Sequence, residues 1–236
     1  MNENITMAER ILDFYSKIPQ ELIVLPDGYR MINPFIGTQK EQVKMVTNAF
    51  YKKYYNDTRE RRLILGSSPA RRGTAVTGVP FEDAKHLWKQ TGITIGKFYI
   101  NKSSSGFLDE VIEAYGGYEK FYSDFYMNFV CPLGIVKNNA RGHEVNCNYY
   151  DNKKLQEGLK SLIVTSLRNQ IKLGIDTSVC YCIGSGENYR FLSEINKEYN
   201  FFDGIVPLEH PRFIMQYNSK RKEAFLKKYL DALSIH

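Results

Sequence analysis

The sequence lacks any long apolar run. None of its 236 residues belong to a stretch approaching the roughly 18 consecutive apolar residues that a membrane-spanning helix needs. The opening residues, MNENITMAER, have neither the basic head nor the apolar core of a secretory signal. No internal repeat and no Pro-, Gly- or Ser-rich linker divides the chain. These absences predict one compact domain over residues 1–236, in an intracellular, cytoplasmic protein without a membrane partner.

Metal-binding sequence motifs are also scarce. The chain has four cysteines but no CxxC unit, and the HxE and PCxxC elements of zinc deaminases are missing. A metal or iron–sulfur site built from cysteines and His143 is one interpretation, but buried core thiols are favoured, so we expect no metal and no cofactor. The net charge of +6 is modest and permits a polyanionic partner without requiring one.

Apolar residues instead recur with strand and helix periods in alternation. Thr6 and Glu9 have capping-box spacing before a first helix, and Val43, Val46 and Phe50 mark one face of a second. Further strands are expected at residues 63–65, 97–100, 126–130, 178–183 and 204–207, and further helices at 82–90, 107–114, 153–173, 187–199 and 220–233, the last capped by Asn218 or Ser219. This order predicts an α/β fold, a three-layer α/β/α arrangement around a mostly parallel sheet of about four to five strands.

Three unusual segments follow predicted strands. They are GSSPARRGTAVTGVPFED at 66–83, MNFVCPLG at 127–134 and PLEHPRF at 207–213. In open parallel sheets, ligands bind beyond the carboxyl ends of the strands. Ser68 and His210 are therefore expected to meet at one crevice.

The first segment allows two generic chemical interpretations. Its glycines, hydroxyls and paired arginines could cradle a phosphate, although the GK[ST] ending of a P-loop is absent. A nucleophilic Ser68 with His210 as base is disfavoured, because the next residue, Pro69, has no N–H to donate to an oxyanion. Ser67 avoids that objection but lacks the G-x-S-x-G spacing.

A third interpretation accounts for more of the residues. From Gly66 to Phe81 the chain resembles the first motif of the uracil-DNA glycosylase superfamily, in particular its single-strand-selective monofunctional branch, with the pattern G-x-N-P-G-x-x-G-x-x-x-T-G-V-P-F. Gly66, Pro69, Gly73 and the TGVPF block match this pattern. Similarly, the HPR sequence from His210 resembles the second motif and the CPL sequence from Cys131 the middle segment, so the resemblance spans about residues 33–217.

This resemblance implies a monofunctional DNA glycosylase of base excision repair that acts on uracil, and on other deaminated bases such as xanthine or hypoxanthine. Such an enzyme extracts the base from single- or double-stranded DNA into a closed pocket. No cofactor is implied, and we expect a monomer.

The resemblance also assigns roles at the base. His210 would donate a hydrogen bond to the base oxygen that gains charge, and Ser68 would hold the attacking water. Phe81 would stack on the base, next to Gly66 and Ser67. The branch has Asn where this chain has Ser68, so Ser67, Glu82, Asp83 or the backbone are alternatives for holding the water. Ala70 likewise replaces the usual Gly.

An asparagine is expected to read the base edge, because an amide offers a donor beside an acceptor. Asn128 is the first candidate, although the family asparagine lies at a slightly different spacing from the CPL element. Asn146 and Asn148 are its competitors.

DNA contacts are expected on both sides of the crevice. Pro69, Arg71 and Arg72 would follow the flanking backbone, and the basic group at 220–222 would meet a phosphate. The adjacent residues Pro211, Arg212 and Phe213 would fill the gap left by the base.

A different class of function stays open. If the change at Ser68 removes the water ligand, the chain is a non-catalytic binder of damaged or single-stranded DNA.

Overall fold

The computed structural model describes residues 5–94, 96 and 105–234. Its central sheet has the strand order β3-β2-β6-β7, and every pairing in it is parallel. The strands are β2 (Arg61–Gly66), β3 (Phe125–Phe129), β6 (Ile175–Ile183) and β7 (Ile205–Leu208). The predicted parallel sheet is thus confirmed, while the strand expected at 97–100 lies outside the described residues.

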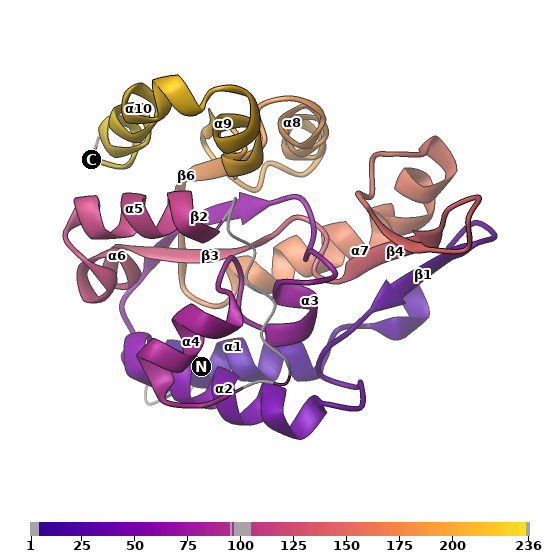
Figure 1. Ribbon diagram of the computed structural model, residues 1–236, viewed down its shortest axis with the longest axis horizontal. Helices are drawn as coiled ribbons and strands as arrows, with labels where there is room; N and C mark the ends of the chain where they lie inside the picture. Colours follow the sequence, from indigo (N-terminus) through magenta and orange to yellow (C-terminus); the bar gives the residue numbers. More distant parts are fainter. Residues whose placement is uncertain (1–4, 95, 97–104, 235–236) are drawn as a thin grey trace.

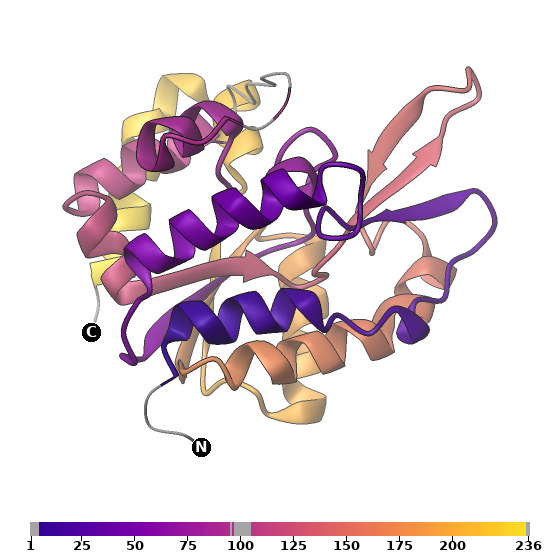
Figure 2. The same cartoon turned by 90° about the horizontal axis from the view of Figure 1, so that it is seen from below.

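Helices cover both faces of this sheet (Figures 1 and 2). On one side lie α1, α2 and α7, and on the other lie α8, α9 and α10. The helix bounds are α1 (Met7–Ser16), α2 (Lys40–Tyr54), α3 (Thr74–Thr77), α4 (Ala84–Thr91), α5 (Ser105–Tyr115), α6 (Tyr118–Asp124), α7 (Lys153–Ile171), α8 (Glu187–Tyr199), α9 (Pro211–Tyr217) and α10 (Lys222–Ser234), with short 3₁₀ turns η1 (Gln20–Leu22) and η2 (Ser219–Arg221). The three-layer prediction is therefore correct. None of the helices in the described residues is long and apolar enough to span a bilayer.

A second sheet was not expected from the sequence. It joins β1 (Tyr29–Ile32), β4 (Gly134–Asn138) and β5 (Glu144–Cys147) in antiparallel order β1-β4-β5. In Figure 2 the β4–β5 hairpin projects away from the helical layers. The loop after β5 returns to the carboxyl edge of the central sheet, so this small sheet delivers side chains to the crevice.

The helix ends follow the sequence at the first helix but not at the last. Thr6 caps α1 with the full capping box, its hydroxyl accepting from the Glu9 N–H while the Glu9 carboxylate accepts from the Thr6 N–H. The last α-helix begins at Lys222, not at 220, because η2 forms the preceding turn, and Asn218 makes no side-chain capping bond there.

Close packing fixes the end of β2. Gly66 pairs with Phe129 of β3, and the Phe81 ring lies directly over the glycine. A Cβ added to Gly66 would lie 2.5 Å from Phe81 Cζ and 2.9 Å from Phe129 Cδ1. The absence of a side chain at this position is therefore what lets two aromatic rings meet across the strand end.

We therefore expect Gly66→Ala to lower the free energy of unfolding by roughly 1–3 kcal/mol, the usual cost of overpacking a core. Chemical denaturation measures this change. Gly204→Ala is the matched control, because the nearest atom to its added Cβ would be Ser178 O at 3.8 Å. Equal stability of the two variants would contradict the packing described for Gly66.

Candidate active site

A cleft of about 520 Å³ opens at the carboxyl edge of the parallel sheet. The segments that follow β2, β5, β6 and β7 form its walls. Its lining residues are Ser67, Ser68, Pro69, Ala70, Asn146, Cys147, Asn148, Tyr150, Gly184, Gly186, Glu187, Asn188, His210, Arg212, Phe213, Gln216 and Tyr217. Ser68 and His210, far apart in the sequence, thus meet at one cavity.

The imidazole of His210 is held in one orientation. His210 is the N-cap of α9, and its Nδ1 accepts a hydrogen bond from the Arg212 N–H at 3.0 Å. Burial lowers the pKa of His210 to about 4, and the charge of Arg212 acts in the same direction. The ring is therefore neutral near pH 7, and because Nδ1 is an acceptor, its hydrogen sits on Nε2.

Ser67 belongs to a second polar group of the cleft lining. Its hydroxyl donates to Asn148 Oδ1 at 3.1 Å, and the Asn148 N–H donates to Asp151 Oδ2 at 2.8 Å. The side-chain nitrogen Nδ2 of Asn148 makes only a long hydrogen bond, at 3.5 Å to Asp151 Oδ1. Asn148 therefore offers a fixed acceptor and an available donor at the cleft. Asn146 also lines the cleft, but its Oδ1 accepts the Arg71 N–H at 2.8 Å.

Asn128 is not brought to this cleft. Its side chain is fully buried and lies among tyrosines, accepting from Tyr15 OH at 3.3 Å and donating to Tyr126 OH at 2.9 Å. Its Oδ1 also accepts the Phe129 N–H. These bonds satisfy the amide inside the protein, so of the three candidate asparagines, Asn146 and Asn148 line the cleft and Asn128 does not.

Phe81 adopts an unusual backbone conformation. Its φ of 63° is in the left-handed region, which a bulky residue rarely occupies. The Phe81 N–H donates to the Thr74 hydroxyl at 3.1 Å, and the next carbonyl, of Glu82, accepts from Thr77 at 3.3 Å. The ring stacks on Phe129, with centroids 4.9 Å apart, and is not part of the cleft lining.

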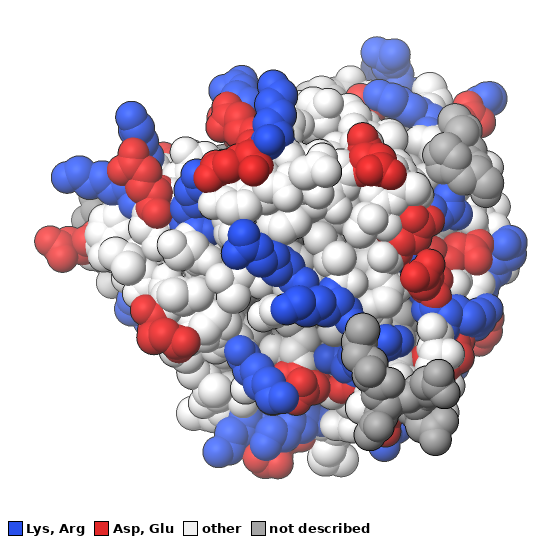
Figure 3. Space-filling model, turned by 180° about the vertical axis from the view of Figure 1, so that it is seen from behind, with Lys and Arg blue, Asp and Glu red and all other residues white. Residues whose placement is uncertain are grey.

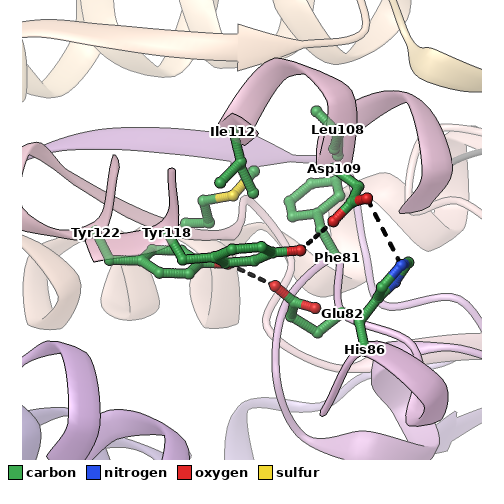
Figure 4. A pocket seen from close by; sticks show the side chains of 9 residues that line it. Phe81, Glu82, His86, Leu108, Asp109, Ile112, Tyr118 and Tyr122 are labelled. Atoms are coloured by element: carbon green, nitrogen blue, oxygen red, sulfur yellow. Dashed lines mark hydrogen bonds and ion pairs between the residues drawn. The ribbon is translucent and has the colours of Figure 1, made fainter. Parts of the chain in front are cut away.

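A buried polar cluster lies beside Phe81 (Figure 4). The Glu82 carboxylate accepts from Tyr122 OH at 2.7 Å and from Gln90 Nε2 at 3.1 Å. Burial raises the pKa of Glu82 to about 7, although both hydrogen bonds oppose the rise. Asp109 accepts from Tyr118 and lies 3.8 Å from His86 Nε2.

The two acidic alternatives for holding water are therefore engaged elsewhere. Glu82 faces this cluster, and Asp83 caps α4 through the Lys85 and His86 N–H groups. The hydrogen bond to Asp83 raises the pKa of His86. Glu82 and Asp83 do not line the cleft, whereas Ser67 and Ser68 do.

The residues expected to contact DNA divide between the cleft and its surroundings. Arg212 and Phe213 line the cleft, Phe213 is 47% exposed, and Arg212 Nε donates to Gln216. Pro211 is buried as the first residue of α9, and the Arg71 guanidinium pairs with Glu144 at 3.6 Å outside the lining.

The expected basic group at 220–222 is engaged in part within the protein. Lys222 Nζ pairs with Glu110 at 2.7 Å, and the Arg221 guanidinium lies over the Phe225 ring. On the face opposite to Figure 1, Lys and Arg lie interspersed with Asp and Glu (Figure 3).

The turn after β6 also belongs to the cleft, and this was not predicted from the sequence. Gly184 and Gly186 line the cleft, and Gly186 is the N-cap of the 13-residue helix α8, so no side chain caps the first N–H groups of that helix. The first N–H groups of such a helix attract anions. The signal was present as Gly-Ser-Gly directly after a predicted strand. Tyr217, 77% exposed at the cleft, had no such signal.

Residues 5–94, 96 and 105–234 contain no cluster of side chains suited to bind a metal ion. No three His, Cys, Asp or Glu side chains there are arranged to hold an ion.

Comparison with known proteins gives one family. The family model for the uracil DNA glycosylase superfamily matches residues 52–234. Among solved structures, the crystal structure of wild-type SMUG2 from Pedobacter heparinus has a TM-score of 0.91 and 42% sequence identity to this chain, with 97% of each chain covered. No curated protein matches the chain.

The buried Glu82 generates a pH prediction. A carboxyl whose pKa rises on folding stabilises the fold below its unfolded pKa of 4.5, and that contribution is lost as the pH rises through about 7. Between about pH 4.5 and 8, the wild type should therefore lose roughly 3 kcal/mol relative to Glu82→Gln, since one pKa unit is about 1.4 kcal/mol. Urea denaturation across this range tests it. Glu157→Gln, an exposed carboxyl on α7, is the control. Parallel pH profiles for wild type and Glu82→Gln would contradict the prediction.

Proposed function

The chain belongs to the uracil DNA glycosylase superfamily, and we propose that it is a monofunctional DNA glycosylase that removes uracil, or another deaminated base such as xanthine or hypoxanthine. The single observation that carries this proposal is the meeting of Ser68 and a neutral His210 at one cleft. The likeness to SMUG2 over nearly the whole of both chains supports it.

His210 would stabilise the leaving base. When the bond between C1′ and N1 of uracil breaks, its electron pair moves into the base, and negative charge develops on the adjacent carbonyl oxygen O2. A neutral Nε2–H can donate to that oxygen without a prior protonation step, and a donor fixed by its bond to Arg212 needs little reorganisation.

Ser68 would hold the attacking water. The oxygen of that water joins C1′, and its released proton balances the charge on the departed base. A serine hydroxyl cannot act as a base near pH 7, so its contribution would be position alone. The oxocarbenium-like sugar requires little more, because it is already strongly electrophilic.

Asn148 would read the base edge in place of Asn128. Its Oδ1 is oriented by Ser67, and its amide nitrogen has only a long contact. At the same cleft, Arg212 and the N–H groups at the start of α8 suit DNA phosphates, and the exposed Phe213 ring suits the gap left by the base.

The absence of a second, lyase step is supported by the lining of the cleft. None of its described residues is a lysine that would form a Schiff base with the sugar.

A non-catalytic DNA binder is the second candidate. Two observations favour it: Ser68 replaces the asparagine of the resembled branch, and the Phe81 ring is covered by Phe129. Binding to lesion-containing DNA without any base release would identify this function.

A strand-cleavage assay tests the proposed function. The protein is incubated with oligonucleotides carrying uracil, hypoxanthine or xanthine, single- and double-stranded, and abasic sites are then cleaved with alkali. We expect breaks at a lesion that depend on the alkali step. Breaks without alkali would indicate a lyase, and measurable binding with no breaks on any substrate would indicate the binder.

We expect His210→Ala to lower kcat/KM for the preferred lesion by roughly 10²- to 10³-fold, the usual cost of losing a donor to a developing oxyanion. Affinity for a DNA with an abasic-site analogue should change little, because this donor acts on the base. His143→Ala, in the β4–β5 turn, is the matched control. Equal losses in excision and in binding would remove His210 from the chemical step.

A further inference from the structure

The Phe129 ring covers one face of Phe81, the ring on which the family resemblance predicts that the base stacks. Phe129 ends β3, is only 5% exposed, and stacks on Phe81 with centroids 4.9 Å apart and planes 25° apart. That is the arrangement a nucleobase would itself adopt on Phe81.

A small cavity beside Phe81 offers no place for a base among the described residues. There the ring borders a cavity of about 10 Å³ with Leu108, Ile112 and Met127, which is room for about one water. Figure 4 shows Glu82 and Asp109 close to the same ring. On the face that Phe129 covers, a base reaches Phe81 only if the Phe129 ring leaves.

We propose that Phe129 determines base specificity, as a movable ring that occupies the stacking place of the extruded base. This inference rests on the proposed function and deepens it. A base enters the site by displacing the Phe129 ring from Phe81, so only bases whose stacking and edge contacts exceed those of that ring are accepted.

Phe81 is the fixed member of the pair. Its left-handed backbone is held through the Thr74 hydroxyl, and its neighbours Glu82 and Asp83 are anchored by Tyr122, Gln90 and the start of α4.

The backbone of Phe129 is pinned as well, which leaves its ring as the part that moves. Phe129 pairs with Gly66, and the following Val130 N–H donates to Gly66 O at 2.8 Å. Gln170 Nε2 donates to the Phe129 carbonyl at 3.1 Å. Rotation of the side chain is therefore the route that leaves these bonds intact. Ser67, the next residue after Gly66, already lines the cleft.

The test uses two variants that remove the ring. Phe129→Ala leaves the volume of the ring empty, and Phe129→Leu fills much of it. Phe125→Leu is the matched control, since Phe125 is buried in the same strand and packs on Tyr115, Phe121 and Tyr181. Two probes separate base acceptance from chemistry: DNA with a uracil nucleotide whose 2′-fluorine slows glycosidic cleavage, and DNA with a tetrahydrofuran abasic analogue.

We expect both Phe129 variants to bind the 2′-fluoro uracil DNA about tenfold or more tightly than wild type, and the abasic DNA equally, because only the first probe must displace the ring. With cleavable uracil DNA, kcat/KM should rise by a similar factor. Phe125→Leu should change neither ratio. Unchanged or weaker binding of the 2′-fluoro probe by folded Phe129 variants would overturn the proposal.

Failure of the proposed function and failure of this inference give different results. If no variant releases any base, the glycosylase proposal fails, while the difference between the two probes still decides the role of Phe129. A crystal structure of the wild type with the 2′-fluoro DNA covers the case in which the variants do not fold. The Phe129 ring should lie away from Phe81 there, and a base bound beside an intact Phe81–Phe129 stack would overturn the inference.

Discussion

The parallel pairing of β2 with β3 and β6 is the constraint on which the site depends. It brings the ends of strands from distant parts of the sequence to one edge, so that the loops after β2, β6 and β7 face a common cleft. Ser68 and His210 owe their proximity to this pairing, and not to any local contact between their segments. Gly66 completes the arrangement, because only a residue without a side chain allows Phe81 and Phe129 to close over the end of β2.

The charges near the cleft differ between His210 and the neighbourhood of Phe81. His210 is kept neutral by burial and by the neighbouring Arg212, which suits a donor to a developing negative charge. Two carboxylates near Phe81 do not line the cleft: Glu82 is held by Tyr122 and Gln90, and Asp83 by the start of α4, so both stabilise the backbone that carries Phe81. Glu187 does line the cleft and pairs with Arg190, beside the hydroxyl, amide and imidazole groups of the other lining residues.

The sequence was sufficient to predict a parallel sheet and the motifs that follow its strands. It was not sufficient to predict the direction in which single side chains point. Alternating apolar periods identified the fold. The SSP sequence at 67–69 and the HPR sequence from His210 identified two segments of the cleft, because each follows the end of a strand. Asn128 shows the limit. Asn128 pairs with Leu65, and the next residue of each strand forms the pair Phe129–Gly66. A shift of one residue along a strand turns the side chain to the opposite face of the sheet. The antiparallel sheet was missed for a related reason, since β1, β4 and β5 each have only four or five residues and β1 pairs with a strand about a hundred residues away. Asn148 reaches the cleft through that sheet, so its position depends on a pairing that short strands do not reveal.

The central claim is that His210 faces the cleft as a neutral imidazole with its hydrogen on Nε2. Nitrogen NMR of the protein with ¹⁵N-labelled histidine tests this most directly, with the His210 signals assigned by comparison with a His210 variant. Near pH 6 we expect a single neutral tautomer for His210, protonated on Nε2, that titrates only as the pH approaches about 4. An imidazolium at pH 6, or a hydrogen on Nδ1, would contradict it.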